Sequence, residues 1–506
     1  MRLTVNALYL GCLRKGANAI PSTLTWLFAV ACLLATLLSA CGGGVGSGGS
    51  GTGLASYSEG VVSGFGSIIV DGTEFADTQA AVQVQTASGT SVNTQVKLGQ
   101  RVLVTHDGSS AASMIQVLPQ LSGPTNGAPD STGLLKVAAQ WVQLIDAASA
   151  TTSRPATLIS GYTSFSSIAG ADEVEVHGNW VLNNTLKAWV LIATRIEKLS
   201  APGSSVLVSG IVKSVPSSAS LRLNAADGSL LQSDSLPTNL KAGQLVSAWI
   251  PHANWGQSPL VATRIALQGI GSLSGVGDNV HVSGLASDYD AASNTVSVQG
   301  VRVSLPAVGG PDQTSLNSGA LVKVDGKGGA LSVQASSASA VQGSGQGVGQ
   351  GQGQSGNAPP PVQLKGVLSG IDWNASNVTF TLRDSTVSAS ASSIDKNCKQ
   401  IASGADAYVA VKGSITPPSS TVQASSVTCS TSAPTGATMK RSGTLQSVSS
   451  TVLNLQTSTG TVQMQIDANT YFEQPSASLI GQTVDVEGVQ ITGSSMLRAK
   501  AVKRAH

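Results

Sequence analysis

Tryptophans and polar side chains gather in two stretches near the middle of the chain, where they could recognise a sugar. The residues concerned are Trp180, Trp189, Trp249, His252, Asn254 and Trp255. An indole ring can pack on the apolar face of a sugar, while amide and imidazole groups hydrogen-bond its hydroxyls. The same tryptophans could instead cap folded units or pack one unit against the next. We therefore expect a glycan site here if the chain binds a ligand, and buried structural tryptophans if it does not.

The start of the chain has the composition of an export signal. Arg2, Arg14 and Lys15 precede an apolar core over 24–38, and no acidic residue interrupts the segment. This order of charge and apolar residues is typical of a secretory signal peptide, and the core is too short for a convincing membrane span. We predict a signal peptide over 1–40.

Leu38-Ser39-Ala40-Cys41 closes this segment and resembles the lipobox of bacterial lipoproteins. In that class the cysteine is acylated and becomes the mature N-terminus, and Gly42 after it indicates the outer membrane. The Gly/Ser-rich stretch over 41–56 would then be a flexible tether between the lipid and a folded body. The alternatives are an uncleaved anchor and an ordinary signal peptide with an incidental cysteine.

Cys398 and Cys429 are the other cysteines that remain after removal of the signal peptide. Export would place them in an oxidising compartment, where paired cysteines form disulfides. We predict a bond between them that closes a loop of about 30 residues, with two free thiols as the alternative.

Other kinds of chemistry find little support. The five histidines, His106, His177, His252, His281 and His506, show no His-x-His spacing, and we interpret the first three as solvated residues at strand ends. No Cys-x-x-Cys pair and no Gly-x-Ser-x-Gly elbow is present, so neither a metal site nor a serine nucleophile is predicted. The mature chain would carry 25 basic and 26 acidic residues without a basic stripe, which argues against nucleic-acid binding. We predict no enzyme, cofactor or metal.

The chain repeats one short pattern, Gly-x-x-Val-x-Val or a close variant. Its copies are Gly99–Val104, Gly170–Gly178, Gly243–Ala248, Gly319–Gly326, Gly404–Gly413 and Gly481–Gly488. The alternation of apolar and polar residues after a glycine turn predicts a strand with one buried face. Copies separated by roughly 70 to 85 residues indicate an array of similar units.

Each unit shows further strand patterns around this motif. Val70-Asp71-Gly72 and Val298-Gln299-Gly300 predict hairpin turns, because their central residues tolerate positive φ. Ala193-Thr194-Arg195-Ile196 and Ala262-Thr263-Arg264-Ile265 predict a last strand. Five short strands with one buried face each would close into a small barrel without free edges. We therefore expect an all-β tandem array of about six five-stranded OB-like β-barrels. The alternative is a β-solenoid, whose coils are usually much shorter than this period.

The predicted units are repeat 1 (57–120), repeat 2 (131–200), repeat 3 (203–270), repeat 4 (278–338), repeat 5 (362–430) and repeat 6 (438–506), with a Gly/Gln/Pro linker over 339–361. We expect the units to fold independently on either side of the linker. The opening Gly-x-Val, the hairpin, Gly-x-x-Val-x-Val and Ala-x-x-Ile follow one another in this order. In this order they resemble exported bacterial lipoproteins with a tandem domain of unknown function 5666. That family is similar in outline to OB-type barrels, and the resemblance implies no particular activity.

Two classes of function are compatible with these features. One is a non-catalytic, lipid-anchored envelope protein whose repeats bind glycan or protein ligands. The other is a purely structural envelope spacer without a specific ligand. We expect the chain to be exported and bound to a membrane, on the outer membrane by the lipobox resemblance, through its N-terminal lipid.

Overall fold

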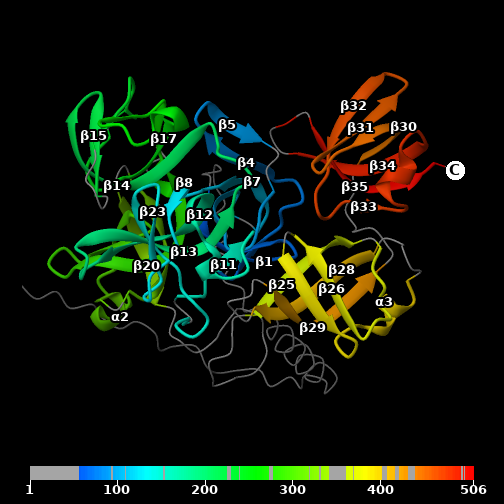
Figure 1. Cartoon of the computed structure of the whole chain (residues 1–506), viewed down its shortest axis with the longest axis horizontal. Coiled ribbons are helices and arrows are strands. Elements are labelled where there is room, and N and C mark those ends of the chain that lie inside the picture. The colour runs from blue at the N-terminus through cyan, green and yellow to red at the C-terminus, as the bar shows by residue number, and fades with distance from the viewer. Residues whose placement is uncertain are drawn as a thin grey trace, which may run out of the picture. The chain divides into compact units, whose positions relative to one another are not determined.

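The computed structural model (Figure 1) describes residues 56–505 with gaps. The gaps are 93–94, 109, 152–153, 225–229, 239, 273–276, 318, 330–331, 341–360, 369, 384, 402–406, 416–420, 431–438, 492–493 and 495. The predicted signal peptide, Cys41, nearly all of the tether and most of the linker lie outside the described residues. Strands contain 59% of the residues and helices 6%, so the predicted all-β class is confirmed.

The first three repeats supply the strands β1 to β19. Repeat 1 holds β1 (Ser56–Phe65), β2 (Ile68–Val70), β3 (Thr73–Phe75), β4 (Ala81–Thr86), β5 (Gly89–Val92), β6 (Arg101–His106) and β7 (Ala112–Val117). Repeat 2 holds β9 (Leu134–Val137), β10 (Gln140–Gln143), β11 (Leu158–Ser160), η1 (Phe165–Ser167), β12 (Gly170–Asn183) and β13 (Ala188–Lys198), with β8 (Leu121–Asn126) just before its predicted start. Repeat 3 holds β14 (Ser205–Ser217), β15 (Ser220–Leu223), β16 (Leu230–Gln232), β17 (Leu245–Pro251), η2 (His252–Asn254), β18 (Leu260–Val261), β19 (Arg264–Leu267) and η3 (Gly269–Ser272).

The remaining repeats supply β20 to β35. Repeat 4 holds β20 (Asn279–Asp290), β21 (Thr295–Val298), β22 (Val301–Ser304), α2 (Gln313–Asn317), β23 (Leu321–Gly328) and β24 (Ser332–Ala340). Repeat 5 holds β25 (Pro361–Leu368), β26 (Asn377–Leu382), β27 (Ser385–Ser390), α3 (Lys396–Lys399), β28 (Ala407–Ile415) and β29 (Val422–Ser430). Repeat 6 holds β30 (Met439–Val448), β31 (Val452–Thr457), β32 (Gly460–Gln465), β33 (Tyr471–Phe472), α4 (Ser476–Leu479), β34 (Thr483–Gln490) and β35 (Leu497–Arg504).

The prediction of a tandem array of small OB-like barrels is wrong, because the chain forms a β-solenoid of about 11 turns. The prediction failed because it assumed that a solenoid repeat would be one coil long, and the repeat period is longer than one coil. About 11 turns over six repeats give nearly two turns for each repeat. A parallel pair, which requires the chain to cross over and return in the same direction, recurs in every repeat. These pairs are β4–β7, β10–β13, β16–β18, β22–β24, β27–β29 and β32–β35.

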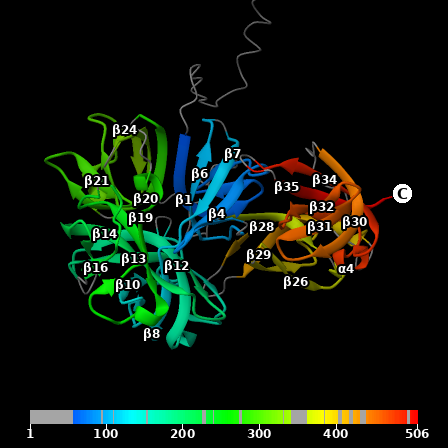
Figure 2. The same ribbon diagram turned by 90° about the horizontal axis from the view of Figure 1, so that it is seen from above.

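Sheets that span two repeats also contradict the expected separation into units. Among the described residues, β1 of repeat 1 pairs in parallel with β20 of repeat 4 within a 12-stranded sheet. A second 12-stranded sheet joins repeats 2 and 3, where β8 pairs with both β12 and β14. Repeat 6 forms a separate sheet. In it, β30 pairs with β31 and with β34, while β35 pairs with β32 and with β34. Its strands lie together in both Figure 1 and Figure 2.

The strand predicted from Gly-x-x-Val-x-Val is present in all six repeats, as β6, β12, β17, β23, β28 and β34. Its two inward residues are almost fully buried, for example Val484 and Val486 in β34 at 0% exposure. The predicted turn between β2 and β3 is also confirmed. Asp71 and Gly72 both adopt positive φ there, at 44° and 83°, as a two-residue hairpin requires.

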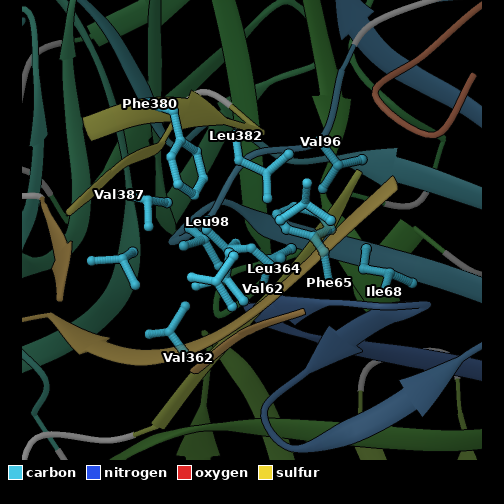
Figure 3. Close-up of a cluster of buried hydrophobic side chains, with 14 of the residues drawn as sticks. Val62, Phe65, Ile68, Val96, Leu98, Val362, Leu364, Phe380, Leu382 and Val387 are labelled. Atoms are coloured by element: carbon cyan, nitrogen blue, oxygen red, sulfur yellow. The ribbon is translucent and has the colours of Figure 1, made fainter. Parts of the chain in front are cut away.

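One apolar core extends from repeat 1 into repeat 5, although the predicted linker separates them in sequence. Val62 and Phe65 of β1 belong to the same buried cluster as Leu364 of β25 and Phe380 and Leu382 of β26. Figure 3 shows these side chains packed together. Burial of apolar surface is the main stabilising contribution in folding, so these repeats are not independent units.

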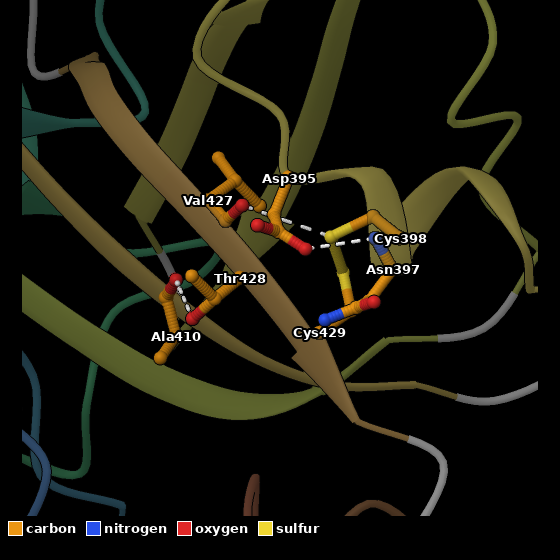
Figure 4. The surroundings of a disulfide bond; sticks show 7 residues. All are labelled: Asp395, Asn397, Cys398, Ala410, Val427, Thr428 and Cys429. Atoms are coloured by element: carbon orange, nitrogen blue, oxygen red, sulfur yellow. Dashed lines mark hydrogen bonds between the residues drawn. A yellow bond between two sulfur atoms is a disulfide. The ribbon is translucent and has the colours of Figure 1, made fainter.

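The predicted disulfide is present. Cys398 in α3 and Cys429 in β29 are bonded, with their Cα atoms 4.9 Å apart. Asp395 begins α3 by accepting a hydrogen bond from the backbone N–H of Asn397 at 2.8 Å (Figure 4). The disulfide therefore fastens this short helix to β29.

Candidate ligand-binding cleft

Trp180, the first of the predicted sugar-binding residues, is buried where repeats 2 and 3 meet. Its side chain is 1% exposed. The indole N–H lies 3.0 Å from Oε1 of Gln120 and 3.3 Å from Oγ of Ser209 on β14. Trp180 thus ties the two repeats together, as the structural alternative for these tryptophans describes.

Four other predicted residues cluster around η2. Trp249 is 6% exposed, and the guanidinium of Arg264 lies 5.0 Å from its ring centroid. His252 Nε2 lies 2.9 Å from a carboxylate oxygen of Glu173 on β12. Asn254 and Trp255 are half-buried, and Trp255 packs against the core of repeats 2 and 3. These residues are close in space, but they do not line the cleft that Trp189 lines.

The interpretation of His177 as a solvated residue is wrong. Its side chain is 1% exposed, Nδ1 accepts from the backbone N–H of Arg101 at 3.4 Å, and Nε2 lies 2.9 Å from Glu175. His177 is buried because this part of β12 lies against Arg101 of repeat 1. A sequence pattern cannot distinguish a neighbouring repeat from solvent.

Trp189 is also buried, at 7% exposure, and only its edge lines a cleft of about 710 Å³ formed by repeats 2, 3 and 4. Other lining residues come from the β12–β13 hairpin, from β14, β20 and β22, and from the residues just after β15 and just before β17. Those with polar or charged side chains include Lys187, Lys213, Asn224, Gln244, Asp288 and Arg302. Leu182 adds apolar surface, while Ile211 and Leu223 are buried, at 4% and 3% exposure, and border the cleft from behind. Ligand sites of proteins commonly have this size and combine apolar walls with a few polar groups.

The β12–β13 turn holds Lys187 at the rim of the cleft. Asn183 Oδ1 accepts hydrogen bonds from the backbone N–H groups of Thr185 at 3.0 Å and Leu186 at 2.9 Å. This side-chain cap defines the turn. Lys187 follows in a left-handed conformation, with φ of 51°, and its side chain is exposed.

The opposite wall depends on a close approach between repeats 3 and 4. Gly300 has φ of 73° in the β21–β22 turn, and a Cβ atom there would clash with Cδ1 of Ile211 on β14. A side chain at this position would require Ile211 to shift and would strain the backbone at this positive φ. Glycine therefore suits the close approach of the two repeats.

The cleft carries more positive than negative charge. Its carboxylate, Asp288, already pairs with Arg302 at 3.0 Å. Lys187 and Lys213 are exposed and have no ion-pair partner among the residues that the structure describes. Two cationic groups are thus available to a ligand. No local sequence pattern marks these lysines, because one lies in a turn of repeat 2 and the other on a strand of repeat 3.

A buried polar network lies where repeats 1, 2 and 4 meet. Arg101 and Glu59 form an ion pair in which both side chains are 0% exposed. Glu59 also accepts from the backbone N–H of Ile270 at 2.6 Å. Gln299, next to Gly300, hydrogen-bonds Asn179 and the carbonyl of Ser283. The network connects side chains of three repeats and contributes to their fixed arrangement.

Comparison with known proteins assigns no family to this chain. No family model matches it, and no curated protein matches it. The resemblance to the tandem domain of unknown function 5666 therefore stays a prediction. Within the described part of the chain, no cluster of three or more His, Cys, Asp or Glu side chains could hold a metal ion. None of the helices described there has the length and apolar character needed to cross a bilayer.

Proposed function

We propose that this chain is a non-catalytic, lipid-anchored protein of a bacterial cell envelope whose repeats bind a glycan or protein ligand. The cleft of repeats 2, 3 and 4 is the observation that carries the proposal. It offers a volume of about 710 Å³, lining residues from three repeats, and two lysines that have no ion-pair partner among the described residues. Such a combination is what a binding site provides, and a spacer has no need of it.

Filling the cleft tests this function. Asn224→Trp places a large side chain in the cleft lining, whereas Asn374→Trp places the same side chain at an exposed position of repeat 5. Immobilised full-length protein is offered soluble envelope glycans and envelope proteins. We expect wild type and N374W to retain the same molecules and N224W to lose them. Equal retention by both variants would exclude the cleft as the binding site.

A structural spacer is the second candidate, and the burial of Trp180 favours it. That residue joins repeats 2 and 3 and is not available to a ligand. If the protein is a spacer, wild type, N224W and N374W should all retain neither glycan nor protein in the same experiment.

The proposed anchor is a lipid on Cys41. The lipobox and the Gly/Ser stretch after it support the proposal, and several acyl chains hold a protein on a bilayer where a single chain is marginal. Cys41→Ser should move the protein from the membrane fraction to the soluble fraction of cells. Gly42→Ser, which keeps the cysteine, is the control, and an unchanged membrane pool for C41S would contradict lipidation.

A further inference from the structure

We propose that the cleft of repeats 2, 3 and 4 binds an acidic oligosaccharide, a sugar chain that carries carboxylate groups. This inference rests on the proposed binding function and specifies its ligand. It is carried by the charges, the lining and the placement of the two lysines.

The charge of the cleft selects an anion. Lys187, Lys213 and Arg302 line it, and Asp288 neutralises only Arg302. Charged residues make up only 11% of the sequence, so a local excess of two positive charges is a distinct feature of this surface. A concave surface of one sign concentrates ligands of the opposite sign.

The positions of the lysines favour a ligand with separated charges over a single small anion. Lys187 lies on the β12–β13 turn of repeat 2, and Lys213 lies on β14 of repeat 3. Each lysine can meet a different carboxylate of an extended ligand. A compact phosphate site, in contrast, usually gathers several backbone N–H groups and cations around one group.

The remaining lining suits sugar rings. Leu182 and Asn224 are half-buried and offer apolar surface and a hydrogen-bonding amide, while Trp189, Ile211 and Ser297 are almost fully buried and reach the cleft only with their edges. A sugar ring presents apolar C–H faces and a polar rim, so both kinds of lining are used. The volume of about 710 Å³ accommodates more than one ring.

Calorimetric titration of purified full-length protein with tetragalacturonate tests the inference, and the fully methyl-esterified tetrasaccharide is the matched neutral ligand. We expect the acidic form to bind and the ester to bind at least about 10-fold more weakly, because the charge-assisted hydrogen bonds are lost. Lys187→Gln and Lys213→Gln should each weaken binding about 3- to 10-fold. Lys412→Gln, the same change on β28 in repeat 5, should leave it unchanged.

The alternatives give different results. Equal binding of the acid and the ester would overturn the acidic ligand and leave glycan binding intact. Binding of inorganic phosphate that competes with tetragalacturonate at similar concentration would show a simple anion site and overturn the oligosaccharide. If tetragalacturonate does not bind while N224W still abolishes retention of another envelope molecule, only this inference fails. If nothing is retained by wild type, the proposed binding function fails with it.

Discussion

Asp71 lies in the β2–β3 turn, and its carboxylate points inward, away from the solvent. It accepts a hydrogen bond from the backbone N–H of Val61 at 2.9 Å and another from the hydroxyl of Ser283 in repeat 4. Burial raises the pKa of Asp71, although these hydrogen bonds and the charges of Lys323 and His281 lower it in part. The group therefore contributes differently to stability at different pH.

Asp71→Asn should remove a pH dependence of stability. Because the folded-state pKa is raised, the unfolding free energy falls as pH rises from the ordinary carboxyl pKa through the folded-state value. The asparagine carries no charge and tolerates the positive φ of this position. We expect the melting temperature of D71N relative to wild type to increase over that pH window and then level off. A difference that stays constant with pH would contradict a raised pKa.

Asp130→Asn is the opposite control. The side-chain and backbone hydrogen bonds from Thr132 and Leu134 lower the pKa of Asp130. Its contribution to stability is therefore present above the ordinary carboxyl pKa and lost as pH falls through the lowered value. D130N should lose stability relative to wild type near neutral pH, and this loss should disappear in acid.

Trp180→Phe tests whether that tryptophan is structural. The change removes an indole N–H that hydrogen-bonds Gln120 and Ser209 in a buried place. An unsatisfied buried polar group costs about 1–3 kcal/mol, so the urea midpoint should fall accordingly. Trp255→Phe, at a half-buried position, should change it less. Equal midpoints for W180F and wild type would contradict the role of Trp180 in joining the repeats.

Residue identity alone could not place the buried polar network. Glu59 and Arg101 precede apolar strand residues and look like members of a solvent-facing row. Both side chains are fully buried because repeat 4 covers them, and β20 of repeat 4 pairs with β1. The same reasoning explains His177, which lies against repeat 1, and Trp180, which lies where repeats 2 and 3 meet. The sequence indicated which residues could recognise a sugar, but not which of them another repeat would cover.

Individual strands were the most predictable elements. Alternating valines after a glycine mark β6, β12, β17, β23, β28 and β34, and their inward side chains are buried as expected. The turns at Asp71-Gly72 and Gln299-Gly300 were equally clear, since both pairs adopt positive φ. These features depend on local backbone and burial preferences. The pairing of strands from different repeats depends on long-range contacts, for which the sequence contained no local signal.

The disulfide between Cys398 and Cys429 should stabilise repeat 5. It spans 31 residues, and the chain-entropy model gives about 3–4 kcal/mol for a loop of this length. Oxidised native protein should show no reactive thiol at these positions. Cys398→Ala combined with Cys429→Ala should lower the stability of repeat 5 measured by hydrogen exchange, and repeat 3 should be unaffected. Unchanged exchange in repeat 5 would contradict a stabilising role.

The repeats on the two sides of the linker should remain together when it is cut. Phe65 and Val62 of repeat 1 share a core with Leu364 and Phe380 of repeat 5, and Arg498 of repeat 6 donates a hydrogen bond to the carbonyl of Ala80 at 2.7 Å. We expect the fragments produced by a protease site inserted within 341–360 to co-elute in size-exclusion chromatography. This replaces the expectation of independent units.

A charge in the shared core provides the matched test. Leu364→Asp places an unpaired carboxylate at a position with 0% exposure, which is strongly unfavourable. The cut fragments of L364D should separate, while those of the exposed variant Lys412→Asp should stay together. Separation of the wild-type fragments without denaturant would show that the contact is too weak to join the repeats.

The position of β1 has a consequence for the order in which the molecule can be built. β1 is the first described strand, yet it lies between β6 and β20, and its parallel partner begins more than 200 residues later at Asn279. Because synthesis of the chain begins at its N-terminus, this sheet cannot be completed until repeat 4 has been made. Pairings across such long sequence separations form slowly, and an unpaired strand edge invites association with other chains. Until repeat 4 arrives, the open side of β1 is the place where a chaperone would be needed most.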